Sequence, residues 1–110
     1  MDGAGFKASL DADGPPAGLS PPLEALWWSA KGDWSESHKV VQQHEDRDCA
    51  WVHAFLHRVE GDLANAKYWY RRAGRRSRPH PQGWRAKRAG CKVETGPLDA
   101  ERDAMIAALL

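Results

Sequence analysis

Apolar side chains in the middle of the chain recur at helical spacing. Between positions 20 and 74 they fall three and four residues apart, and alternating apolar and polar runs, which indicate strands, are absent. The clearest stripe consists of Val52, Phe55, Leu56 and Val59. This pattern predicts an all-α protein.

Capping residues mark the ends of four helices in this region. Ser and Asp side chains accept hydrogen bonds from the free N–H groups at a helix start, and Gly adopts the left-handed conformation that ends a helix. The predicted helices run from Ser20 to Gly32, from Asp33 to Glu45, from Asp46 or Asp48 to Gly61, and from Asp62 to Gly74. A fifth helix is expected after Asp99, with Leu98, Met105, Ile106 and Leu109 on one side.

The step Gly32-Asp33 recurs as Gly61-Asp62. An aromatic-rich helix precedes each step, and a capped helix follows it. Two tandem antiparallel helical hairpins are therefore expected, each burying one face against the next. Because two repeats leave an open end, we expect the C-terminal helix to cap it.

Composition divides the chain into four parts. Positions 1–19 are rich in Gly and Pro and predict a flexible N-terminal arm, followed by the helical-hairpin core at 20–74. Positions 75–97 contain three Pro and three Gly and predict a basic linker or insertion, before the C-terminal helix at 98–110.

The segment from Gly61 to Gly74 resembles the second half of a tetratricopeptide-type repeat. Such repeats place Gly at the turn between helices and then Ala, Tyr and Ala at packing positions. Here the matching residues are Gly61, Ala66, Tyr70 and Ala73. The distance between the two corners is shorter than the usual repeat of about 34 residues, so regular superhelical stacking is not implied.

A wider stretch, from Leu23 to Gly74, is similar to a family of short uncharacterised bacterial proteins. The similarity is carried by Trp51-Val-His-Ala-Phe-Leu-His-Arg58, by Glu60-Gly-Asp62 and by Asn65-Ala-Lys-Tyr-Trp-Tyr70. The resemblance implies an all-helical bacterial cytoplasmic protein and supplies no activity.

Composition excludes several classes of protein. The net charge of +1 excludes a chain that is acidic or basic as a whole. The two cysteines, Cys49 and Cys91, form no CxxC pair, so they indicate reduced thiols in a cytoplasmic protein rather than a zinc ribbon. No apolar run approaches the roughly 20 residues of a membrane span.

Two histidines, His53 and His57, lie one helical turn apart and project from one side of the third predicted helix. Such a pair can hold a divalent metal, with Glu60 adding an oxygen and His38 completing the set. However, there is no His-Glu-x-x-His motif, so the metalloprotease arrangement lacks its general base. The sequence therefore favours helical histidines with a structural role, no metal and no cofactor.

Several aromatic and arginine side chains are left over after the core is assigned, and such residues are enriched in interface hot spots. We expect them to form a contact surface for a partner protein or a second copy of the chain. They are Trp28, Trp51, Arg58, Tyr68 and Arg72.

The stretch from Arg71 to Arg88 holds half of the chain's 16 basic residues and none of its 15 acidic ones. Basic residues interleaved with an aromatic suit the phosphates and bases of single-stranded nucleic acid. They suit an acidic protein patch equally well, and a solvated loop is the plain alternative. The candidate contact residues are Arg75, Arg76, Arg78, Trp84, Arg85 and Arg88.

No catalytic constellation is recognisable, since phosphate-binding loops, nucleophile elbows and paired carboxylates are all missing from the sequence. The sequence therefore predicts a non-enzymatic protein-binding or assembly module that is able to self-associate. One alternative is a nucleic-acid-binding accessory protein that uses positions 71–88. Another is a metal-dependent enzyme centred on His53 and His57.

Overall fold

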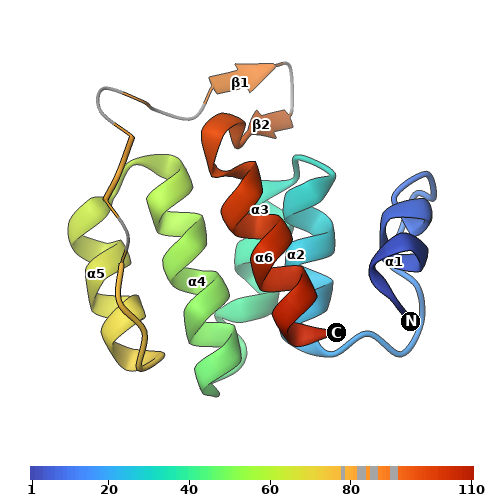
Figure 1. Ribbon diagram of the computed structural model, residues 1–110, viewed down its shortest axis with the longest axis horizontal. Helices are drawn as coiled ribbons and strands as arrows, with labels where there is room; N and C mark the ends of the chain where they lie inside the picture. The colour runs from blue at the N-terminus through green and yellow to red at the C-terminus, as the bar shows by residue number, and fades with distance from the viewer. Residues whose placement is uncertain (78, 82–83, 85–86, 90–91) are drawn as a thin grey trace.

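A computed structural model describes residues 1–77, 79–81, 84, 87–89 and 92–110 (Figure 1). The helices are α1 (Gly3–Ser9), α2 (Pro21–Ala30), α3 (Trp34–Val41), α4 (Arg47–Glu60), α5 (Leu63–Arg72) and α6 (Asp99–Leu109), with a 3₁₀ turn at Gly96–Leu98. The all-α fold class is confirmed.

Two glycine–aspartate corners connect the helices of the core. Gly32 and Gly61 have φ angles of 85° and 88°, in the left-handed region that favours glycine. The aspartate after each glycine caps the next helix by accepting a hydrogen bond from a backbone N–H three residues on, at 3.0 Å for Asp33 and 3.2 Å for Asp62. The two corners are thus equivalent, and they fold α2 onto α3 and α4 onto α5.

Helix α3 ends earlier than the sequence predicts, at Val41 instead of Glu45. The N–H groups of Gln43 and His44 donate to the carbonyls of Val40 and Val41, at 3.3 and 3.2 Å, which closes the helix in tight turns. The chain needs the following residues to reverse direction before Asp46 caps α4.

The main core lies where α2, α4 and α6 meet. Trp27, Phe55 and Met105 are fully buried there, one from each of these helices. Figure 1 shows α6 lying across the front of α2, beside α4. The C-terminal helix therefore covers apolar surface that the hairpins leave open.

The N-terminal segment differs from the predicted flexible arm, because it contains α1. The side chain of Asp2 caps this helix by accepting from the N–H of Gly5 at 2.8 Å, and Phe6 is buried. The indole N–H of Trp27 donates to Ser9 Oγ at 3.0 Å, which ties α1 to α2. Burial of the Phe6 ring and these hydrogen bonds hold the segment in place, although its Gly-rich composition favours a flexible chain.

The predicted basic linker also contains regular structure. Strands β1 (Lys87–Ala89) and β2 (Lys92–Glu94) pair antiparallel, with Arg88 opposite Val93. The N–H of Val93 donates to the carbonyl of Gly32 at 2.8 Å, so the hairpin is attached to the first corner. A two-stranded ribbon of this length has too few residues to show an alternating pattern.

Among the described residues, no helix has the length and apolar character needed to cross a membrane.

Candidate metal centre

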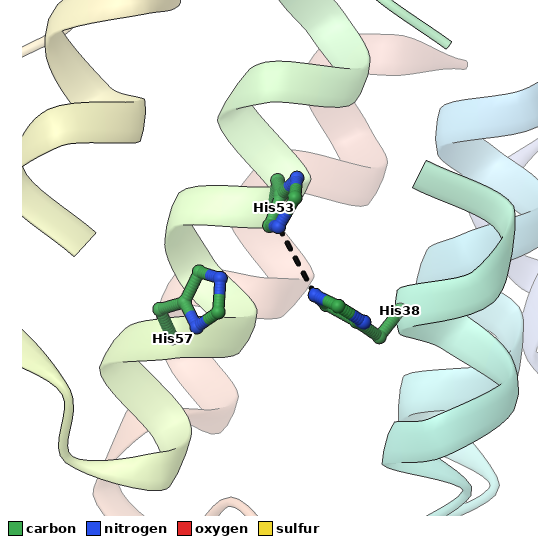
Figure 2. Close-up of side chains that lie close together, drawn as sticks. All are labelled: His38, His53 and His57. Atoms are coloured by element: carbon green, nitrogen blue, oxygen red, sulfur yellow. Dashed lines mark hydrogen bonds between the residues drawn. The ribbon is translucent and has the colours of Figure 1, made fainter. Parts of the chain in front are cut away.

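Three histidines from two neighbouring helices come together at one place in the fold. His38 projects from α3, and His53 and His57 project from successive turns of α4 toward it (Figure 2). His53 and His57 are 6% and 7% exposed, whereas His38 is half-buried. The site therefore lies at the seam between the α2–α3 hairpin and the α4–α5 hairpin.

The spacing of the ring nitrogens suits one shared ion. The Nε2 atoms of His38 and His53 are 3.1 Å apart, and one nitrogen from each of the three rings lies within 4.8 Å of the others. Two nitrogens bound to a tetrahedral zinc ion at about 2.0–2.1 Å are roughly 3.3 Å apart. The first pair therefore already has the required separation, and the third ring needs a small movement inward.

Two indoles hold the rings in position. The ring of Trp34 stacks on His38 with centroids 4.8 Å apart and an interplanar angle of 10°, and that of Trp69 stacks on His53 at 3.9 Å and 14°. The indole N–H of Trp34 also donates to the carbonyl of Leu56 at 2.8 Å. Both imidazoles are therefore packed against flat apolar surfaces that limit their rotation and their contact with water.

Hydrogen bonds fix the orientation of His57. Its Nδ1 lies 2.6 Å from a carboxylate oxygen of Glu60, and its Nε2 lies 3.3 Å from the side-chain nitrogen of Asn65. Because a carboxylate only accepts and an amide nitrogen only donates, Nδ1 carries a proton and the lone pair of Nε2 accepts from Asn65, which has to release it before Nε2 can bind an ion. A metal-ligating histidine commonly donates its other ring N–H to a carboxylate in this way.

Electrostatics keep two of the rings neutral. Burial, followed by the proximity of His57 and His38, lowers the pKa of the His53 imidazole to about 3. The pKa of His38 is also lowered, first by burial and then by His57, against an opposing effect of Glu60. Neutral imidazole is the form that binds a metal ion.

A second group of side chains, formed by His57, Glu60 and Asp62, also lies within ligand distance. Its members already have other partners. Asp62 caps α5 through the N–H of Asn65, and the close approach of Glu60 to His57 is a hydrogen bond. The three-imidazole group is therefore the better candidate for direct ligation, with Glu60 supporting one of its rings.

The residues predicted to form a protein-contact surface do not share one face. Arg58 is 4% exposed and donates to Glu101 Oε2 at 2.8 Å, so its charged group is directed into the protein. The ring of Trp28 packs against the core and meets Trp27 edge to face. Trp51 is half-buried on α4.

Tyr68 and Arg72 lie together on the exposed side of α5. Tyr68 is 49% exposed, and Arg72 donates to its hydroxyl at 3.1 Å. The guanidinium of Arg72 also lies over the ring of Trp69, 5.1 Å from its centroid. Contact of this pair with another protein stays a prediction.

The predicted nucleic-acid residues fall into three groups. Arg75 and Arg76 are exposed just after α5. Trp84 is half-buried against the core, and its ring lies close to Gly96, so it is not a free stacking surface. Arg78 and Arg85 lie outside the described residues, and for Arg88 only the backbone in β1 is described.

Sequence reasoning found the three histidines but missed two of the side chains around them. The spacing of His53 and His57 is local and is visible in the sequence. Trp69 and Asn65 reach the site from α5, and their position depends on how α5 packs against α4. The sequence feature that could have located these two residues is the recurring Gly-Asp corner, because it indicates that α5 folds back beside α4.

The fold and the site together define an all-helical protein with a buried histidine cluster between two hairpins. Comparison of the chain with protein-family models, with curated proteins and with solved structures found no match. The resemblance to short bacterial proteins accordingly stays a prediction.

Proposed function

We propose that this protein binds a divalent transition-metal ion through His38, His53 and His57, and that the ion joins its two helical hairpins. The observation that carries the proposal is the 3.1 Å separation of the Nε2 atoms of His38 and His53, which belong to different hairpins. The nearby His57 supplies the third donor when its Nε2 exchanges the hydrogen bond of Asn65 for the ion.

Zinc is the ion that the donors favour. Imidazole nitrogens suit zinc, copper, nickel and iron, and zinc accepts three histidines with a solvent molecule as fourth ligand. His38 is the most exposed of the three rings, so solvent has its readiest access to the cluster from this side. The ring that donates from Nε2 in the His38–His53 hydrogen bond has to carry its proton on Nδ1 instead when the ion binds both Nε2 atoms.

The proposed role is structural. The indoles of Trp34 and Trp69 occupy the space against two of the three rings that a substrate would need. An ion that binds only the folded chain stabilises it by about 2.7 kcal/mol when its free concentration is 100 times the dissociation constant. The ion therefore favours the arrangement in which the two hairpins are docked.

Isothermal titration calorimetry with Zn²⁺ tests the proposal on protein without a polyhistidine tag and previously treated with a chelator. We expect one ion per chain, a rise in melting temperature on addition, and the visible absorption of tetrahedral Co²⁺ when cobalt replaces zinc. The substitution His38→Gln should abolish all three signals, because it removes one of the three imidazole nitrogens that would bind the ion.

The matched control is His44→Gln, since His44 is an exposed histidine close to the end of α3. This variant should bind zinc like the parent protein. The proposal is overturned if the parent takes up neither zinc nor cobalt, or if both glutamine variants lose binding equally. A second variant, His57→Gln, separates loss of a donor from any local effect on α3.

A further inference from the structure

Two surface hollows meet at the two arginines that follow α5. Both are lined by Arg75 and Arg76. One has a volume of about 370 Å³ and is also lined by Lys67 and Arg71, and the other has a volume of about 350 Å³ and is also lined by Trp51. The pair forms a continuous surface from α5 to the junction of α4 and α6, on residues other than the histidines.

The first hollow is strongly cationic. Among the residues that the structure describes, four basic side chains line it together with Tyr70 and Ser77, and no carboxylate does. Arg71, Arg75 and Arg76 are exposed, and within the described part of the chain no carboxylate lies within ion-pair distance of them. Such a hollow attracts phosphate groups.

The second hollow is more enclosed and has a mixed lining of apolar and charged side chains. Trp51, Ala104 and Met105 line it, and its one carboxylate, Glu101, already bonds to Arg58 and Tyr70. The guanidinium of Arg75 lies over the indole of Trp51 with 3.5 Å between its central carbon and the ring centroid. The guanidinium therefore covers this face of the indole, and its own outer face is left as the planar cationic surface on which a base can stack.

We propose that this surface, formed by Trp51, Lys67, Arg71, Arg75 and Arg76, binds single-stranded nucleic acid. Phosphates occupy the cationic hollow, and a base enters the second hollow and stacks on the Arg75 guanidinium that Trp51 supports. This planar support favours a nucleic acid over an acidic protein, because a carboxylate pairs with arginine but does not stack on it. The proposal is independent of the metal site, and it relies on Trp51 where the sequence indicated Trp84.

Fluorescence anisotropy with a short labelled oligo(dT) tests this proposal on the full chain. The double variant Arg71→Glu, Arg76→Glu should bind much more weakly, and affinity of the parent protein should fall steeply as salt increases. Removal of two phosphate contacts should reduce the slope of log affinity against log salt by about 1.4, at roughly 0.7 per contact for a single strand. The matched control is Arg72→Glu, which is compared with the single variant Arg71→Glu: each reverses one charge at neighbouring positions of α5, and Arg72 lines neither hollow.

Further measurements distinguish binding of a nucleic-acid strand from binding of single nucleotides or of acidic polymers. Trp51→Leu should weaken binding roughly 5- to 150-fold if a base stacks there, with circular dichroism confirming that the helices persist. An unlabelled mononucleotide at the same phosphate concentration should compete far less well than oligo(dT). The proposal fails if the parent does not bind oligo(dT), if Arg72→Glu loses as much affinity as Arg71→Glu, or if polyglutamate competes as well as unlabelled oligo(dT).

Discussion

Replacement of Arg58 should destabilise the protein strongly, although its place in the sequence resembles that of a surface arginine. The side chain is 4% exposed and donates from Nη1 to Glu101 and from Nη2 to the carbonyl of Pro79, both at 2.8 Å. The hydroxyl of Tyr70 donates to the other oxygen of Glu101 at 3.0 Å. One guanidinium thus connects α4, α5, α6 and the segment after α5.

The magnitude follows from the charge that the substitution leaves behind. Arg58→Met keeps much of the apolar contact but leaves the carboxylate of Glu101 with only the tyrosine hydroxyl as a partner. Breaking a buried ion pair on one side costs about 3–5 kcal/mol. Replacing both charges, in Arg58→Met with Glu101→Leu, should cost less than the sum of the single losses by about 0.5–3 kcal/mol.

Urea unfolding followed by circular dichroism measures these differences, with a constant m-value showing that the comparison is sound. Arg72→Met is the control, because Arg72 is exposed and should change the free energy of unfolding by no more than about 0.5 kcal/mol. The reasoning is refuted if Arg58→Met costs as little as the control, or if the losses of the two single variants simply add.

Two further predictions concern the glycines of the two corners and the buried thiol of Cys49. Gly61→Ala should cost about 1–2 kcal/mol of unfolding free energy from the left-handed backbone alone. Gly32→Ala should cost more, because its added Cβ would also lie 2.9 Å from Lys92 Cβ; equal losses would contradict this. Burial, followed by the hydrogen bond and charge of Asp46, raises the pKa of Cys49 to about 12. At pH 8 almost none of the thiol is then ionised, and iodoacetamide should label a Cys91→Ser variant more than about 100-fold more slowly than free cysteine; labelling of the folded protein at the rate of the free thiol would refute the shift.

The sequence predicts the fold best where the information is local. Each glycine–aspartate corner combines a residue that tolerates positive φ with a residue that caps the next helix. The apolar stripe of α4 is likewise local, and its members are buried as expected. These features depend only on neighbours within one or two helical turns, so they can be read without knowing the tertiary structure.

Long-range pairing is what the sequence leaves out. Arg58 lies off the apolar stripe of its helix, and its partner Glu101 is 43 positions away on α6. Phe6 lies in a Gly-rich segment whose composition indicates flexibility, yet α1 packs onto α2 and buries it. In both cases a distant partner determines the burial, and no local pattern encodes that partner.

The candidate metal site depends both on local spacing along one helix and on long-range docking of the two hairpins. The i, i+4 spacing sets His53 and His57 on one side of α4, whereas His38 joins them only because the first hairpin docks on the second. Trp34 spans the same seam, stacking on His38 and donating to Leu56. An ion bound there should raise the free energy needed to separate the two hairpins more than the free energy of local unfolding within either hairpin.

Hydrogen exchange with and without Zn²⁺ measures this difference. Amides of α3 and α4 should exchange more slowly when zinc is present, since opening of the seam then requires release of the ion. Amides of α1 should keep their rates under the conditions in which the whole chain stays folded, because α1 is attached to α2 and shares no contact with the histidines. Equal protection of α1 and α3 would show that zinc acts on global stability alone, and slower exchange confined to α4 would show that His38 does not ligate the ion.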